Sequence, residues 1–112
     1  MKKLLLTLLC LPMLILAQQT YIPDDNFEQA LIDLGYDNLL DNYVLTTNIN
    51  AVTNLDVNNQ NIADLTGIED FTALTWLHCG SNQLTILDVR NNIALTYLKC
   101  WYNQLTILDV RN

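Results

Sequence analysis

Apolar and polar positions in the second half of the chain follow a pattern that returns at a fixed interval. Residues 74–91 and 95–112 align at an offset of 21 residues, and most aligned pairs are identical. One repeat earlier, at an offset of 22, apolar residues fill the same slots at Val52, Leu55, Val57 and Ile62. Because tandem similarity at this period is typical of stacked repeats, the pattern predicts three of them: 52–73, 74–94 and an incomplete 95–112.

Each repeat begins with the pattern L-x-x-L-x-C-x-x-N-x-L, or a close variant of it. Its alternating apolar positions predict a short strand whose apolar side chains point inward. Asn82 and Asn103 follow the strand, and their amides are expected to satisfy backbone groups that have left the strand ladder. Gln60 stands at the equivalent turn of the first repeat and departs from the pattern.

A second apolar signal is nested inside each repeat. Residues 84–89 restate the strand pattern about ten residues after the first strand, and residues 105–110 do so again. The first repeat carries its second apolar stripe at Leu65, Ile68 and Phe71. Each repeat is therefore expected to carry two extended segments, one on each side of a flattened coil.

This pattern is the leucine-rich repeat consensus. Residues 74–112 resemble the nested 21-residue repeats of bacterial surface proteins (the Irreko type), and residues 52–73 resemble the 22-residue internalin type. The resemblance implies an α/β repeat solenoid, mostly β: a short right-handed leucine-rich repeat coil over residues 51–112. It implies a shared scaffold and leaves the activity open.

Residues 18–50 precede the repeats and predict a small helical cap. Asp25-x-x-Glu28 matches a helix-capping box, and Gly35 supplies a residue suited to a left-handed helix end. Between them, apolar residues recur at helical spacing: Phe27, Ala30, Leu31 and Leu34. Similar helix-first caps precede repeats in exported leucine-rich repeat proteins of the Bacteroidetes group, and a cap shields the first coil from water.

The first 17 residues read as a secretory signal peptide. A basic start at Lys2 and Lys3 is followed by an apolar run from Leu4 to Ala17, broken by Pro12. The run is too short to span a bilayer as a helix, so we expect an exported chain without an integral membrane span after leader removal. The product would be secreted or held at the outer envelope. Lipid attachment at Cys10 is an alternative, although Leu9 precedes it where a small residue is needed.

Charge excludes several classes of partner. The chain has 12 acidic and 5 basic residues, a net charge of −7, and the leader holds two of the cations. A polyanion binder needs a basic patch that releases counterions, and three scattered cations do not form one. Nucleic acids and anionic membrane surfaces are therefore poor partner candidates.

The sequence offers no convergent set of catalytic groups. His78 is the only histidine, and we read it as a solvated strand residue. Cys79 and Cys100 occupy inward slots and are expected to stack as thiols, with a disulfide as the alternative. Acidic and Asn residues are abundant over 37–61, but their spacing is not that of a calcium loop. We predict no enzyme activity, no cofactor and no metal.

The outward positions of the strands carry the candidate binding residues. Stacking the repeats places large aromatics beside one another, edged by a histidine and a lysine: Trp76, His78, Tyr97, Lys99, Trp101 and Tyr102. Clustered Trp and Tyr mark interfaces with proteins or sugar rings, although cross-strand aromatic pairs also stabilise sheets. The opposite stripe is the same in both later repeats and looks structural: Ile86 and Ile107, Asp88 and Asp109, Arg90 and Arg111.

Two functions fit these features. The first is a non-enzymatic, exported binding or adhesion module that recognises an unidentified protein or glycan through its strand face. The second is a structural spacer, a fragment of a larger cell-surface leucine-rich repeat protein. The third repeat ends without a cap, which predicts a fragment of a longer array or self-association through that repeat.

Overall fold

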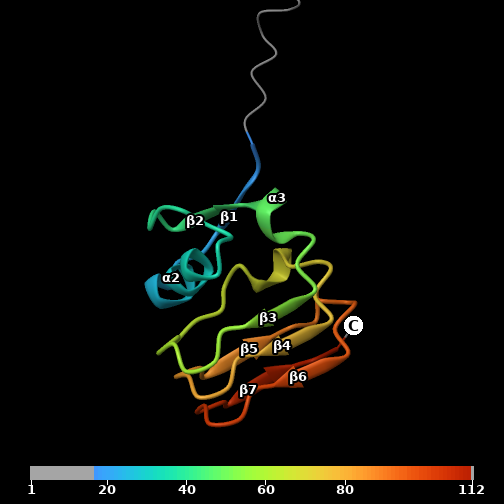
Figure 1. Cartoon of the computed structure of the whole chain (residues 1–112). Helices are drawn as coiled ribbons and strands as arrows, with labels where there is room; N and C mark the ends of the chain where they lie inside the picture. Colours follow the sequence, from blue (N-terminus) through green and yellow to red (C-terminus); the bar gives the residue numbers. More distant parts are fainter. Residues whose placement is uncertain (1–16, 112) are drawn as a thin grey trace, which may run out of the picture.

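The computed structural model describes residues 17–111 (Figure 1). Of the predicted leader it includes only Ala17, so Cys10 lies outside the described residues. A small α/β cap comes first in the chain, and the strands of the repeats follow below it as successive layers (Figure 1). No helix within residues 17–111 has the length and hydropathy needed to cross a bilayer.

The cap contains a strand pair in addition to the predicted helix. Strand β1 (Gln19–Tyr21) pairs antiparallel with β2 (Tyr43–Leu45), and Thr20 lies opposite Val44. Helix α2 (Asp25–Asp33) lies between them in sequence, and the short helix α3 (Thr46–Ile49) leads into the repeats. The helix follows from the sequence pattern, but the strand pair does not, because the two strands are three residues long and more than twenty residues apart.

The predicted capping box at Asp25 and Glu28 is wrong. The N-cap of α2 is Asp24, whose Oδ1 accepts hydrogen bonds from the N–H groups of Asn26 and Phe27 at 2.9 and 3.0 Å. Asp24 Oδ2 also accepts from the N–H groups of Ala63 and Asp64 at 2.9 and 3.0 Å. One carboxylate thus starts the helix and ties the cap to the first repeat.

Helix α2 ends at the glycine that the sequence indicated. Gly35 has φ +89°, and its N–H donates to the carbonyl of Ile32 at 2.9 Å. Tyr36 N–H donates to the carbonyl of Leu31, also at 2.9 Å. These two bonds form a Schellman motif, in which only glycine adopts the left-handed conformation at low cost. The predicted helix end is confirmed.

The repeats form two parallel sheets, which confirms the two extended segments in the second and third repeats. The first sheet has the order β3 (Asn54–Asp56), β4 (Trp76–His78), β6 (Tyr97–Lys99). The second pairs β5 (Ile86–Asp88) with β7 (Ile107–Asp109). The first repeat forms no second strand, so that expectation is wrong there: residues 64–66, which align with β5, are not a strand, and a 3-10 turn, η1 (Ile68–Asp70), follows them.

One apolar core runs from the cap through the repeats. Phe27 of the cap stacks on Phe71 of the first repeat with ring centroids 6.3 Å apart. The middle residues of β3, β4 and β5 are buried: Leu55, Leu77 and Leu87. In the third repeat the inward side chains are less covered, since Leu98 is half-buried and Leu108 is 49% exposed.

Candidate functional site

The outward face of the three-stranded sheet carries two columns of side chains. Strand register aligns Asn54, Trp76 and Tyr97 in one column. The Trp76 and Tyr97 rings stack with centroids 5.8 Å apart and an interplanar angle of 3°. Trp76 is half-buried and Tyr97 is 45% exposed, so the pair forms a raised aromatic surface.

The second column is polar and includes the single histidine. It aligns Asp56, His78 and Lys99, and His78 Nδ1 lies 3.5 Å from Asp56 Oδ1. The His78 ring is flanked edge-on by Trp76 and Trp101, at 5.9 and 6.1 Å between centroids. Its side chain is only 16% exposed, so our reading of it as a solvated residue is wrong. The aromatic neighbours, which belong to two different repeats, cover it.

Lys99 joins the two aromatic groups. Its Nζ lies 5.7 Å from the ring centroid of Tyr97 and 5.2 Å from that of Trp101. Both distances are within the range of cation–π attraction, which holds the ammonium group over the rings. Trp76, His78, Tyr97, Lys99 and Trp101 therefore form one connected surface, the aromatic ridge.

Gly80 also shapes this surface, although it is not among the predicted site residues. A Cβ atom there would lie 3.2 Å from His78 Nε2 and 3.2 Å from the Trp101 indole. The absence of a side chain lets Trp101 fold down against His78. The signal was present in the alignment, because Gly80 occupies the slot that Trp101 fills in the next repeat.

Tyr102 lies apart from the aromatic ridge. It has φ +55°, is 80% exposed, and makes no ring contact among residues 17–111. The equivalent residues Asn59 and Ser81 have φ +57° and +53°. This turn position thus requires a left-handed backbone in each repeat, which aims Tyr102 away from the strand.

The turn asparagines link consecutive repeats. Asn82 Oδ1 accepts from the N–H groups of Gln60 and Ile62, each at 3.0 Å, and its Nδ2 donates to three carbonyls: Val57, Cys79 and Gly80. Asn103 accepts from Leu84 N–H and donates to the carbonyls of Cys79, Cys100 and Trp101. Gln60 instead donates to its own turn, at the carbonyl of Asn58.

Cys79 and Cys100 are unbridged in successive repeats. Burial, together with the neighbouring Cys100 thiol, raises the pKa of Cys79 to about 12. Burial also raises the pKa of Cys100. Because only the thiolate is a good nucleophile, both side chains act as small apolar residues near neutral pH.

The cap gathers three carboxylates, from Glu28, Asp37 and Asp41, whose oxygens lie within 4.8 Å of one another. Glu28 is fully buried and accepts from the N–H groups of Asp41 and Asn42 at 3.1 and 2.8 Å. Burial raises the pKa of Glu28, and the two neighbouring carboxyl groups add to this while the N–H groups oppose it. The cluster holds the loop after α2 against the helix.

Comparison with known proteins places this geometry among leucine-rich repeat proteins. The chain is 41% identical over 72 residues to Internalin J of Listeria monocytogenes serotype 4b, which covers 64% of this chain and 8% of that protein. No protein-family model matches. The chain therefore spans less than a tenth of this curated relative.

Solved structures give the same fold. The functional domain of InlJ from Listeria monocytogenes, which includes a cysteine ladder, superposes with a TM-score of 0.71 and 39% identity over 87% of this chain and 22% of that chain. Internalin C2 from the same organism gives 0.67 and 20% identity over 86% of this chain and 50% of that chain. The chain has a leucine-rich repeat fold, with Cys79 and Cys100 in one slot of successive repeats.

Proposed function

We propose that this protein is a non-enzymatic, exported binding module that recognises a protein or glycan through the strand face of a right-handed leucine-rich repeat solenoid. The aromatic ridge is the observation that carries the proposal. Its residues vary between repeats whose inward residues are nearly the same. A scaffold that is kept while its outer residues change is what a recognition surface requires.

The composition of the aromatic ridge suits ligand contact. Tyr97 and Trp101 are 45% and 55% exposed, and both offer large rigid rings that lose little entropy on binding. Lys99 adds a cationic donor held over the rings, and Asp56 adds an acceptor beside His78. Such a surface can stack a sugar ring or seat an apolar side chain while it hydrogen-bonds a polar rim.

Export is the cellular setting of this proposal. It rests on the basic start and apolar run of residues 1–17, after which we place the cap at 18–50 and the repeats at 51–112. The nested 21-residue pattern of residues 74–112 supports an Irreko-type array, and its helix-first cap supports a Bacteroidetes-like one. The similarity to Internalin J supports a surface-binding or adhesion role.

A spacer in a larger cell-surface protein is the second candidate. It is favoured by the opposite face, where Ile86, Asp88 and Arg90 recur unchanged as Ile107, Asp109 and Arg111. Arg90 lies 3.1 Å from Asp88 and 3.9 Å from Asp109, so these charges neutralise one another within and between repeats. The outward charges of such a face contribute stability and are already paired with one another.

The double variant Trp76→Ser, Tyr97→Ser separates the two candidates. Labelled wild-type and variant protein are applied to a glycan array and to cultured cells, and circular dichroism and denaturant unfolding check the fold. A binding module loses its binding and keeps its fold. A spacer binds nothing on either support, or binds equally well before and after the substitutions.

A further inference from the structure

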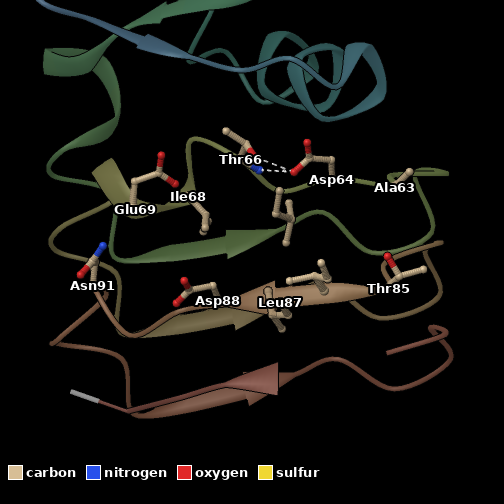
Figure 2. Close-up of a pocket in the computed structure, with 11 residues that line it drawn as sticks. Ala63, Asp64, Thr66, Ile68, Glu69, Thr85, Leu87, Asp88 and Asn91 are labelled. Carbon is tan, nitrogen blue, oxygen red and sulfur yellow. Dashed lines mark hydrogen bonds between the residues drawn. The ribbon is translucent and has the colours of Figure 1, made fainter. Parts of the chain in front are cut away.

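A second surface lies away from the aromatic ridge. A cavity of ≈ 660 Å³ opens between β5 and residues 63–69 of the first repeat. Figure 2 shows β5 with Leu87 and Asp88 on one side, and Asp64, Thr66 and Glu69 on the other. Its volume is in the range of small-ligand and peptide sites.

The cavity exists because β5 has no strand partner on this side. The first repeat forms turns and η1 where a second strand would pair, so β5 is the edge of its two-stranded sheet. Ile107 N–H donates to the carbonyl of Thr85 at 3.3 Å, and Val89 N–H donates to that of Asp109 at 2.9 Å. Alternate residues of β5 therefore face β7.

The intervening residues of β5 face the cavity. In a parallel ladder both backbone groups of one residue point to the same side, so Ile86 and Asp88 direct their N–H and C=O groups away from β7. Outside the β5–β7 ladder, no backbone group within residues 17–111 hydrogen-bonds to the N–H of either residue. Such an edge is a template for an added strand.

The two ends of the cavity limit what can enter. Gln83 N–H donates to the carbonyl of Ile62 at 2.8 Å and closes one end. Asn92 Nδ2 donates to the carbonyls of Ile68 and Phe71 at 2.8 and 3.1 Å and closes the other. The open stretch, residues 85–88, is about 13 Å long at ~3.3 Å per residue, which fits an extended segment of about four residues.

The lining favours a positively charged occupant. Buried Leu65, Ile68 and Leu87 form an apolar floor, and none of the eleven lining residues is basic. Asp64 Oδ1 accepts from Thr66, and Glu69 Oε2 accepts from Gly67 N–H. Each of these carboxylates keeps its second oxygen for a ligand. Asp88 is already paired with Arg90 at 3.1 Å.

We propose that this cavity binds a short extended peptide segment that carries a lysine or arginine. The segment pairs with the free edge of β5 at Ile86 and Asp88, and its cationic side chain is held by Asp64 and Glu69. Main-chain hydrogen bonds supply the affinity, and the two carboxylates select the charge. This site is separate from the aromatic ridge and does not depend on the function proposed for it.

The test uses the blocked peptide acetyl-Val-Lys-Val-Lys-amide and NMR of the ¹⁵N-labelled protein. We expect saturable shifts of the Ile86 and Asp88 amides, with a dissociation constant of about 1 mM. Glu69→Gln keeps the acceptor for Gly67 N–H but removes one charge, and it should weaken binding about 3- to 5-fold. Asp33→Asn, which removes an equal charge at the exposed end of α2, should leave binding unchanged.

A second pair of peptides separates strand pairing from simple charge attraction. The same peptide with N-methylated backbone amides should lose most of its binding, since it cannot pair with the edge of β5. Acetyl-Val-Glu-Val-Glu-amide should not bind. The proposal is overturned if the acidic or methylated peptide binds as well as the first, or if the shifts map to the aromatic ridge. It is also overturned if no saturable shift appears up to about 5 mM peptide.

Discussion

The two faces of the repeats share one inward framework and differ in what they show to solvent. On the three-stranded sheet, here called the strand face, the outward residues change from Asn54 to Trp76 to Tyr97 in register. On the two-stranded sheet, here called the opposite face, Ile86 is repeated as Ile107 and Asp88 is repeated as Asp109. The leucines at the centre of the strands are the same on both faces.

This difference separates what the fold requires from what it leaves free. Inward leucines and turn asparagines are kept because their burial and hydrogen bonds hold consecutive repeats together. The opposite face repeats a set of mutually neutralised charges. Only the strand face carries three large aromatic rings at positions that vary between repeats, and we assign recognition to it for this reason.

The largest expected effect comes from removing the asparagine side chain that hydrogen-bonds the first repeat to the second. Asn82→Ala takes away five hydrogen bonds from a nearly buried side chain, and the carbonyls and N–H groups left behind cannot reach water. We expect a loss of about 4 kcal/mol in the free energy of unfolding. Asn103→Ala should cost clearly less, because Asn103 is partly exposed. Urea unfolding measures both, and equal costs would contradict the account.

Matched core truncations test whether the buried leucines under the two sheets contribute equally to the free energy of unfolding. Leu77→Ala and Leu87→Ala each empty a fully enclosed site, one under each sheet, and should cost about 3 kcal/mol each. Leu108→Ala should cost much less, since Leu108 is 49% exposed. Thermal and urea unfolding provide the measurement. A large inequality between Leu77 and Leu87 would show that one sheet carries the core alone.

A smaller effect is expected at the glycine beneath the aromatic ridge. In Gly80→Ala the new methyl group meets His78 Nε2 and Trp101 at 3.2 Å, so Trp101 must move outward. We expect a cost of about 1 kcal/mol and a red shift of tryptophan fluorescence. Asn58→Ala, at the equivalent position of the first repeat, is the control and should leave the fluorescence unchanged. An unshifted spectrum in Gly80→Ala would mean that Trp101 does not rest on this glycine.

The smallest effect concerns the charges of the opposite face. Hydrogen bonds from the Arg111 side chain, at 3.0 and 2.7 Å, and from its N–H hold the pKa of Asp109 at about 2. Because this pKa is depressed on folding, the stabilisation is present above the ordinary value near 3.8 and is lost as the pH falls toward 2. In Arg111→Gln the pKa of Asp109 should rise toward its ordinary range. NMR titration of the Asp109 carboxyl measures it, and an unchanged midpoint would show that Arg111 is not the cause.

Residues governed by local pattern could be predicted from the sequence. The inward slots of Leu55, Leu77 and Leu87 follow from alternation, because a strand sends successive side chains to opposite faces. Gly35 was identifiable as the helix end, because few other residues tolerate its conformation. These features depend on a few neighbouring residues and on the repeat interval.

Features that depend on distant contacts could not be predicted. The burial of His78 needs Trp101 from the next repeat, and the role of Asp24 needs the backbone of Ala63. The edge of β5 is free because the first repeat does not form a second strand. The sequence does not indicate this, because Leu65 and Ile68 continue the apolar pattern of such a strand. The repeat pattern indicated that aromatics would gather on the strand face, but only the assembled repeats separate Tyr102 from them.

Binding by variants of the two faces tests the central claim most directly. Trp76→Ser, Tyr97→Ser removes exposed aromatic surface from the strand face, and Ile107→Ser removes exposed apolar surface of β7 from the opposite face, outside the cavity beside β5. All proteins are measured on one glycan array and on the same cultured cells. We predict that the strand-face variant loses at least about tenfold in affinity, as expected for interface aromatics, while the opposite-face variant binds as wild type does. Equal loss in both variants, or loss only in the opposite-face variant, would contradict recognition through the aromatic ridge.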